Sequence, residues 1–224
     1  PMLGTLADNG GTTQTNALLV GSPAIDVGDT SINSGFDQRG APFQRFVNGR
    51  VDMGAFEDIS LVVNSTGDGD DGDVYNGVTT LREIINQANL IKRSDVVLFD
   101  TLFDTAQVIN LGSSLSSISD ELTITGPGAN LLTIDAGGGT NGVVGNGDGF
   151  GVLRVDDGDV GNQLNVQISG VKLTGGDPNS QGGALANIGE SVSLTAVHIT
   201  DNAGTEGGGV WSLDGVLSIA DSTL

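Results

Sequence analysis

The most regular pattern along the chain is a series of short, largely hydrophobic runs, several of which alternate hydrophobic and polar positions. In residues 94–224 these runs are separated by glycine and asparagine, and they include Val96–Phe99, Val108–Leu111, Leu122–Thr125 and Leu131–Ile134. Alternation with a period of two, bounded by turn residues, is typical of β-strands rather than helices. We therefore expect this region to be a succession of short strands.

The same region contains an internal repeat. Gln181–Leu185 recurs as Glu206–Val210, a shift of 25 residues (206 − 181). Val192–Thr195 recurs as Leu217–Ala220 with the same shift (217 − 192). A period in this range, with no helix inside the repeat, is typical of a solenoid whose coils stack strand upon strand.

Stacked coils assign roles to particular side chains. Alternation turns small aliphatic residues inward, where we expect them to stack on Leu217, Ile219 and their neighbours; these are Val192, Leu194, Val197 and Ile199. The Gly-Gly pairs allow tight corners with positive φ. We expect Asn202 to be a left-handed corner residue, because asparagine tolerates that conformation.

One segment, residues 59–93, departs from this pattern. It begins with a predicted strand, Ile59–Val63, and continues through an acidic loop into a predicted helix. Thr80 and Glu83 form the S/T-x-x-E capping box that starts a helix. The apolar residues that follow share one helical face, at positions i, i+3, i+4 and i+7; they are Leu81, Ile84, Ile85 and Ala88.

Residues 1–58 are loop-rich, with turn signals at Ala7–Gly11, Gly21–Pro23 and Asp37–Gly40 and no helical period. The sequence therefore predicts three regions. These are the C-terminal end of a preceding β-helix unit over 1–58, a strand, acidic loop and capping helix over 59–93, and the coils of the next unit over 94–224.

Composition fits a chain that turns often and carries excess negative charge. Glycine occurs 37 times, and 28 acidic residues outnumber 8 basic ones, which gives a net charge of −20. Binding to nucleic acid or to an anionic membrane needs clustered cations, which this chain lacks. Cysteine is absent, which excludes a disulfide scaffold. No apolar run reaches the roughly 18 residues of a membrane helix.

The predicted helix resembles a signature of large bacterial surface proteins. Thr80–Asn89 is similar to the CSLREAI…AN motif, with Thr79 at the usual cysteine and Ile84 at the usual alanine. In those proteins the motif precedes parallel β-helix coils with Gly-Gly corners, as in choice-of-anchor and polymorphic outer-membrane proteins. Residues 1–58 resemble the C-terminal end of such a unit, at Leu6–Gly11, Gly21–Asp29, Asp37–Gly40 and Val51–Glu57.

Together the repeat and the resemblance predict an all-β, right-handed parallel β-helix with one short capping α-helix. In this chain the motifs typical of the end of one unit precede those typical of the start of the next. This order implies a tandem array. The resemblance also implies a secreted or cell-surface protein without catalytic activity. We therefore expect a structural or adhesive stalk or fibre, whose partners are other copies of the chain, glycans or cell-surface proteins.

The acidic loop is the candidate metal site. Asp68, Asp70, Asp71 and Asp73 place four carboxylates within six residues. Alternating aspartates in a flexible loop are a common source of oxygen ligands for Ca²⁺. A full EF-hand pattern is absent, because Thr79 stands at the twelfth position. The alternative is a solvated acidic turn, which is also our expectation for Asp156–Asp159.

An enzymatic alternative, a polysaccharide lyase or hydrolase on the same fold, has little support among the residues. A lyase needs a cation beside a carboxylate, and the candidates are Arg154 with Asp156, or Lys172 alone. A hydrolase needs two convergent carboxylates, and no pair stands out. Alternation points His198 outward. Trp211 is expected to fill a coil corner, with a sugar-stacking platform as the alternative. We therefore assign no catalytic residue.

The ends of the chain predict how it assembles. Pro1–Gly4 lacks the features of a signal peptide, so we expect an internal fragment. Val216–Leu224 is expected to lie inside a coil and to leave strand edges and apolar core unpaired, and such edges recruit matching strands. The best match is the N-terminal region of another copy, a head-to-tail contact that gives fibres.

Overall fold

A computed structural model describes residues 1–19, 22–29, 31, 35–41, 43–46, 50–58, 61–74, 76–90, 94–159 and 161–224. The chain divides into two compact units. Unit 1 contains Pro1–Ser60 and Leu90–Arg93, and unit 2 contains Leu61–Asn89 and Ser94–Leu224. This grouping joins most of the predicted middle segment to the strands that follow it.

Unit 1 is built around one antiparallel hairpin, β1 (Leu3–Ala7) and β2 (Thr15–Leu18). Its other described residues form turns and loops. Leu18, Ala24 and Phe56 are buried together in a small apolar cluster. Phe43 and Val51 are also buried, and polar contacts within unit 1 help to position its loops.

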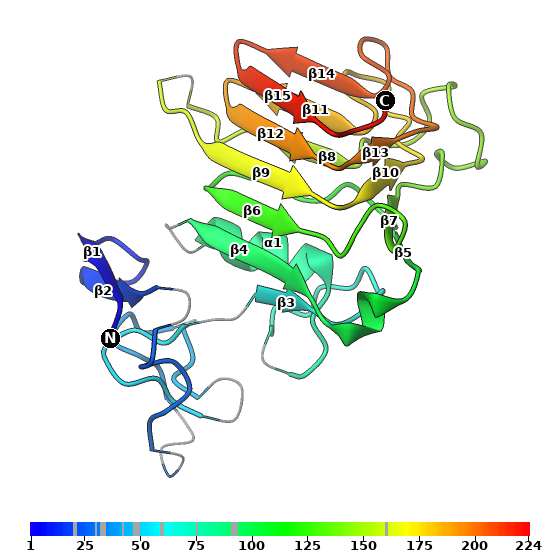
Figure 1. The fold of residues 1–224 in the computed structure, drawn as a ribbon. Helices are drawn as coiled ribbons and strands as arrows, with labels where there is room; N and C mark the ends of the chain where they lie inside the picture. The colour runs from blue at the N-terminus through cyan, green and yellow to red at the C-terminus, as the bar shows by residue number, and fades with distance from the viewer. Residues whose placement is uncertain are drawn as a thin grey trace. The chain divides into compact units, whose positions relative to one another are not determined.

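Unit 2 consists of parallel sheets (Figure 1). The six-stranded sheet has the order β15-β12-β9-β6-β4-β3, the four-stranded sheet β13-β10-β7-β5, and the three-stranded sheet β14-β11-β8. The strands are β3 (Leu61–Val63), β4 (Asp95–Phe99), β5 (Gln107–Asn110), β6 (Leu122–Thr125), β7 (Leu132–Asp135), β8 (Leu153–Val155), β9 (Asn165–Ser169), β10 (Lys172–Thr174), β11 (Leu185–Ile188), β12 (Ser191–Thr195), β13 (His198–Ile199), β14 (Val210–Leu213) and β15 (Val216–Ala220). Every pairing between these strands is parallel.

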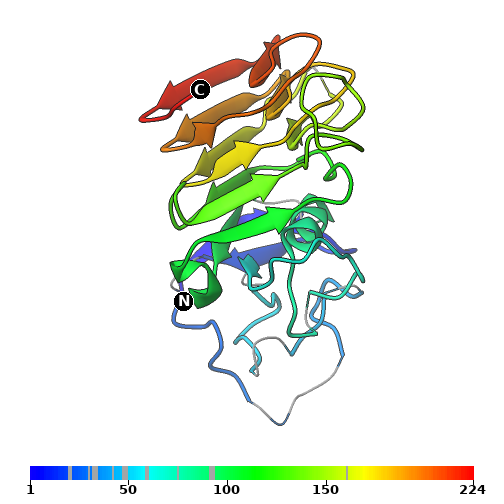
Figure 2. The same ribbon diagram turned by 90° about the vertical axis from the view of Figure 1, so that its right-hand side faces the viewer.

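The chain visits the three sheets of unit 2 in a fixed order. From β6 onward it passes from the six-stranded to the four-stranded to the three-stranded sheet, and then begins the next circuit. Figure 2 shows strands of successive circuits stacked on one another. Each strand therefore pairs with its equivalent one circuit later, which satisfies its backbone groups between circuits.

The sequence repeat sets the register of this stacking. Val192 pairs with Leu217 and Leu194 with Ile219, as the 25-residue shift predicts. The residues predicted to point inward are all buried: Val192, Leu194, Val197 and Ile199. Short strands of alternating pattern form here because one face of each sheet packs on this shared apolar interior.

The corners between sheets require left-handed backbone. Gly182 and Gly207, one repeat apart, have φ of +71° and +63°, as predicted. A Cβ on Gly182 would lie 2.4 Å from the carbonyl oxygen of Leu185, so a larger residue would collide there. The prediction for Asn202 is wrong. The left-handed residue is Asp201, with φ of 53°, and the Asn202 amide instead accepts from Gly176 N at 2.9 Å.

Among the described residues there is one α-helix, α1 (Leu81–Leu90), and all of it except Leu90 belongs to unit 2. Its predicted apolar face is buried: Leu81, Ile84, Ile85 and Ala88. The capping box is present, since Glu83 N donates to Thr80 Oγ1 at 3.2 Å and Thr80 N donates to Glu83 Oε2 at 2.9 Å.

A 3-10 helix follows β4 at Thr101–Asp104. The predicted strand before the acidic loop forms over Leu61–Val63, and residues 59 and 60 lie outside the described residues. No helix among the described residues is long and apolar enough to span a membrane.

Candidate functional site

The acidic loop named by the sequence, here the first acidic loop (68–76), is held against its surroundings by hydrogen bonds. Asp68 pairs with Arg82 of α1 at 2.8 Å, and both side chains are largely buried. The same carboxylate accepts from Gly112 N at 2.8 Å. Asp70 accepts from Asn86 Nδ2 at 2.6 Å. These contacts fasten the loop to the helix and to the segment after β5.

The next aspartate of this loop organises the loop itself. Asp71 accepts from Asp73 N at 3.0 Å and from Asn76 Nδ2 at 2.6 Å. Asp71 N donates to Glu83 Oε1 at 3.1 Å. Among the described residues, no three or more carboxylate or imidazole side chains are arranged to hold a metal ion. Calcium binding by Asp68, Asp70, Asp71 and Asp73 stays a prediction.

The structure reveals a second loop of the same design. Asp70–Asn76 reads D-D-G-D-V-Y-N and Asp156–Asn162 reads D-D-G-D-V-G-N, 86 residues later (156 − 70). In this second acidic loop (156–162), Asp157 accepts from Asp159 N at 2.7 Å and from Asn162 Nδ2 at 2.6 Å. The Asn162 bond holds the pKa of the Asp157 carboxyl below its usual range.

Each acidic loop donates a hydrogen bond to a buried glutamate, which lies in α1 for the first loop and between β11 and β12 for the second. Glu83 serves the first loop and Glu190 the second, where Glu190 Oε2 accepts from Leu164 N at 2.6 Å and Oε1 from Asp157 N at 3.3 Å. Burial raises the pKa of Glu190. The Asp156–Asp159 turn is therefore held in place by hydrogen bonds. The feature of the sequence that could have predicted this is the identity of Asp156–Asp159 to Asp70–Asp73.

Unit 1 contains a cluster of buried charged side chains, which the sequence motifs did not predict as a site. Arg39 pairs with Asp37 at 2.6 Å with both side chains fully buried. Its guanidinium lies 3.9 Å from the ring centroid of Phe43 and 3.8 Å from that of Phe56. It also donates to the Glu57 carbonyl oxygen at 2.8 Å. A buried ion pair needs such additional donors, acceptors and rings to offset its desolvation.

Glu57 and Asp52 extend this cluster. Asp52 N donates to Glu57 Oε2 at 3.0 Å, and the Asp52 carboxylate accepts from Asp26 N at 2.7 Å and Asp58 N at 2.5 Å. Desolvation by burial raises the pKa of Glu57 to about 8, with the Asp52 and Asp37 charges adding to the effect. Burial likewise raises the pKa of Asp52. Residues from motifs that are separated along 1–58 therefore lie together in one polar core.

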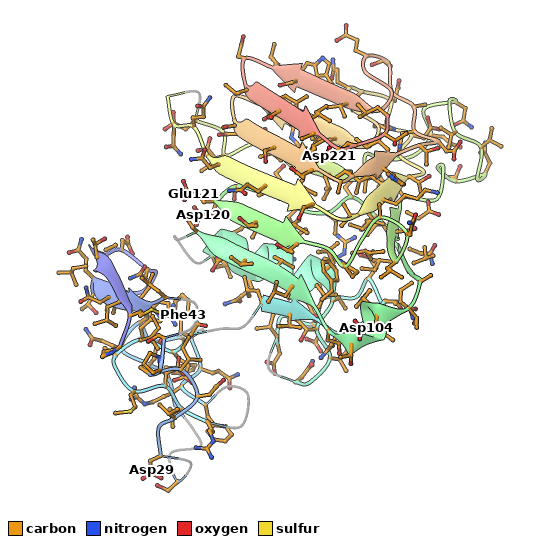
Figure 3. All side chains as sticks on the ribbon, viewed as in Figure 1. Asp29, Phe43, Asp104, Asp120, Glu121 and Asp221 are labelled. Carbon is orange, nitrogen blue, oxygen red and sulfur yellow. The ribbon has the colours of Figure 1, made fainter. Side chains whose placement is uncertain are left out.

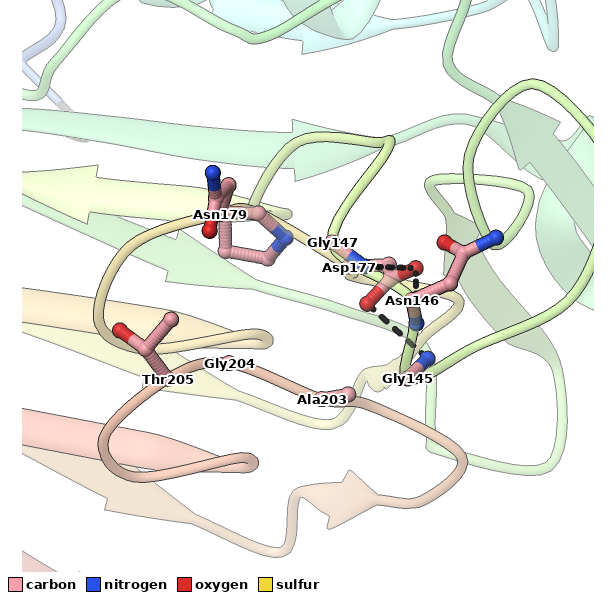
Figure 4. A pocket seen from close by; sticks show the side chains of 9 residues that line it. Gly145, Asn146, Gly147, Asp177, Asn179, Ala203, Gly204 and Thr205 are labelled. Carbon is pink, nitrogen blue, oxygen red and sulfur yellow. Dashed lines mark hydrogen bonds between the residues drawn. The ribbon is translucent and has the colours of Figure 1, made fainter.

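Two hollows lie on the loops that lead into the three-stranded sheet. The smaller, the Asp177 hollow, has a volume of about 170 Å³. In Figure 4 the Asp177 carboxylate points at the loop carrying Gly145 and Gly147, whose backbone N–H groups donate to it at 3.0 and 3.1 Å. Asn146 N donates at 3.3 Å. Asp177 therefore has a structural role, since its oxygens are occupied by the backbone.

The larger hollow, the β8–β11 cleft, has a volume of about 320 Å³. Its lining includes Phe150, Arg154, Asn179, Ser180, Gln181 and Ala186. The two hollows share Pro178 and Asn179, so they adjoin along the stack. Arg154 is half exposed and pairs with Asp156 at 2.7 Å. Sequence reasoning missed this cleft because its residues come from separate circuits.

The remaining residues singled out by the sequence lie apart from one another. His198 is partly exposed on β13 and pairs in register with Lys172 of β10, on a different sheet from Arg154. Trp211 lies within β14, in register with Ala186, and its Cβ would lie 2.9 Å from a Cβ built on the corner residue Gly207. The acidic side chains labelled in Figure 3 include Asp104, after β4, and Glu121, before β6.

Comparison with protein-family models, curated proteins and solved structures finds no match to this chain.

Proposed function

We propose that unit 2 is a segment of a right-handed parallel β-helix that serves as a structural and adhesive element of an extracellular or cell-surface protein. The proposal is non-enzymatic. The cyclic passage of the chain through three parallel sheets supports the β-helix, because each circuit repeats the same strand order. A stack of this kind can be lengthened by further circuits without changing its cross-section, which suits a stalk or fibre.

The observation that carries the proposal is the stacking of equivalent strands in register, up to β15 at one end of the six-stranded sheet. Ile219 of β15 holds the register of Leu194, yet Ile219 is 39% exposed while Leu194 is 1% exposed. On the same edge Val216 and Leu213 are also exposed. A further circuit, from the same chain or from a neighbouring copy, can pair with β15 in the same register and cover these apolar side chains.

The matching surface is proposed to be the N-terminal region of a neighbouring repeat or of another copy, which gives head-to-tail stacking. Unit 1 supports this, because its hairpin exposes Leu3 and Leu6. Within unit 2, α1 is bonded through Asn86 and Asn89 to the segment between β5 and β6, and its Leu81 and Ile84 are fully buried. The β15 edge therefore has the exposed apolar residues and the strand register that stacking needs.

The test is sedimentation velocity and electron microscopy of the chain at rising concentration. We expect end-to-end oligomers in the unmodified chain and their loss in Ile219→Lys, which places a charge on the open edge. Val108→Lys is the matched control, because Val108 is exposed on β5, away from that edge. A monodisperse monomer at every concentration, or equal loss of oligomers in both variants, would overturn the proposal.

A further inference from the structure

The β8–β11 cleft is positioned by strand register. Ala186 of β11 pairs with Arg154 of β8 on one side and with Trp211 of β14 on the other. Leu153 and Leu185, their neighbours along β8 and β11, are buried in the interior, so Arg154 and Ala186 point outward. This face of the sheet thus carries Arg154 and Trp211 in one row, on either side of the Ala186 methyl group, which is only 6% exposed.

The small residue at the centre makes the row concave. Neighbouring strands lie about 4.8 Å apart, so Arg154 and Trp211 flank Ala186 at a separation of about 10 Å. Gly182 packs closely against this point, since a Cβ on it would lie 2.9 Å from the Ala186 Cα atom. Phe150 and the polar side chains of Asn179 and Gln181 complete the wall.

The cleft also differs in charge from the rest of the chain. Of the 28 acidic side chains in the sequence, none is among the described residues that line the cleft, and one lines the adjoining Asp177 hollow. That one, Asp177, is buried and its oxygens accept backbone N–H groups. Arg154 donates to Asp156 through Nε and Nη2, which partly neutralises its charge. The lining is therefore polar and close to neutral.

We infer that the β8–β11 cleft binds a neutral polysaccharide chain, which runs along the stack from the cleft into the adjoining Asp177 hollow. A volume of about 320 Å³ is at the lower end of ligand pockets, and the second hollow extends it across successive circuits. Amide, hydroxyl and guanidinium groups match the donors and acceptors of sugar hydroxyls. Phe150 supplies an apolar face for a pyranose ring.

The net charge selects between sugar classes. A chain with a net charge of −20 repels a polyanion over most of its surface, and the cleft offers a single cation already paired with a carboxylate. A neutral glycan meets no such repulsion, and the Arg154–Asp156 pair presents both donors and acceptors to its hydroxyls. This site does not depend on whether the coils stack between molecules.

The chain itself contains a reporter, because Trp211 is the single tryptophan and lies in register beside the cleft. We would titrate the protein with soluble fragments of a β-1,4-glucan, a β-1,4-mannan and an α-1,4-glucan, and follow Trp211 fluorescence. Affinity electrophoresis in gels containing each polymer supplies a second readout. Polygalacturonate is the acidic comparison.

Arg154→Ala and Ser180→Phe change the cleft at exposed or half-exposed positions, the first removing donors and the second filling space. We expect each to weaken binding of the recognised neutral glycan at least tenfold, with an unchanged melting temperature. Lys172→Ala is the matched control, since it removes a cation from a different sheet. It should bind as the unmodified chain does.

Three outcomes would overturn the inference: no response to any of the neutral glycans, binding of polygalacturonate alone, or equal weakening in Lys172→Ala and Arg154→Ala. Measuring the same titration on Ile219→Lys separates this site from the stacking proposal. Binding retained in that variant supports the cleft whatever the assembly state. Binding lost only there assigns the glycan to the stacked edge and removes it from the cleft.

Discussion

Replacing Glu57 by glutamine is expected to stabilise unit 1 in neutral and alkaline solution. Glu57 is only 2% exposed, its Oε2 accepts from Asp52 N, and no group in the described part of the chain bonds its Oε1. Desolvation by burial raises the pKa of this carboxyl to about 8. Glutamine has nearly the same shape and stays neutral at every pH, so it mimics the protonated acid.

The magnitude follows from the linkage between proton binding and folding. Each tenfold change in proton affinity is worth about 1.4 kcal/mol. The difference between 4.5 and about 8 therefore corresponds to about 5 kcal/mol as an upper figure. Because the folded pKa lies above the unfolded one, this stability is fully present below about pH 4.5 and is lost as the pH rises through about 8. Glu57→Gln removes the loss, so the two proteins should agree in acid and diverge in alkali.

The assay is amide hydrogen exchange of residues 50–58 between about pH 5 and pH 9, corrected for intrinsic exchange rates. The peptide reports on unit 1 alone, whereas the single tryptophan lies in unit 2. Glu206→Gln is the control, because it removes one negative charge from an exposed position. If protection in the unmodified chain does not fall relative to Glu57→Gln as the pH rises, Glu57 is ionised in the folded state and the burial argument fails.

Two further predictions concern unit 2. Asn187 is fully buried and donates to Glu190 O and Ser212 Oγ. Asn187→Ala should therefore lower the free energy of unfolding, measured by denaturant titration, by about 2 kcal/mol. Asn179→Ala, at an exposed position, should change it little. If the first acidic loop binds calcium, added Ca²⁺ raises the melting temperature and a chelator lowers it; an unchanged melting temperature in both would leave only the protein hydrogen bonds there.

The features that the sequence predicted are those set by local or repeating signals. The helix start at Thr80 and Glu83 depends on residues three positions apart, so it can be read directly. The pairing of Val192 with Leu217 follows from the repeat, because equivalent strands in successive circuits meet in register. Both signals are independent of how the intervening loops run.

The features that it did not predict depend on the path of loops. The contact of Glu190 with Asp157 joins residues 33 positions apart in sequence, with no periodic signal between them. In unit 1, Arg39 and Glu57 meet only because several loops fold together. Asp201 and Asn202 both tolerate left-handed backbone, so residue type alone could not choose between them.

The unequal spacing of paired strands has a consequence for how such a chain can change. Along the six-stranded sheet, Leu122 pairs with Val166, 44 positions on (166 − 122), whereas Val192 pairs with Leu217, 25 positions on (217 − 192). The additional residues lie in loops outside the strands, and the register is the same on both sides of them. Insertions and deletions at these loops therefore need not disturb the interior. Surface variety and architectural constancy are separable in this chain, so new recognition loops can be acquired by lengthening a connection while the ladder of strands is inherited unchanged.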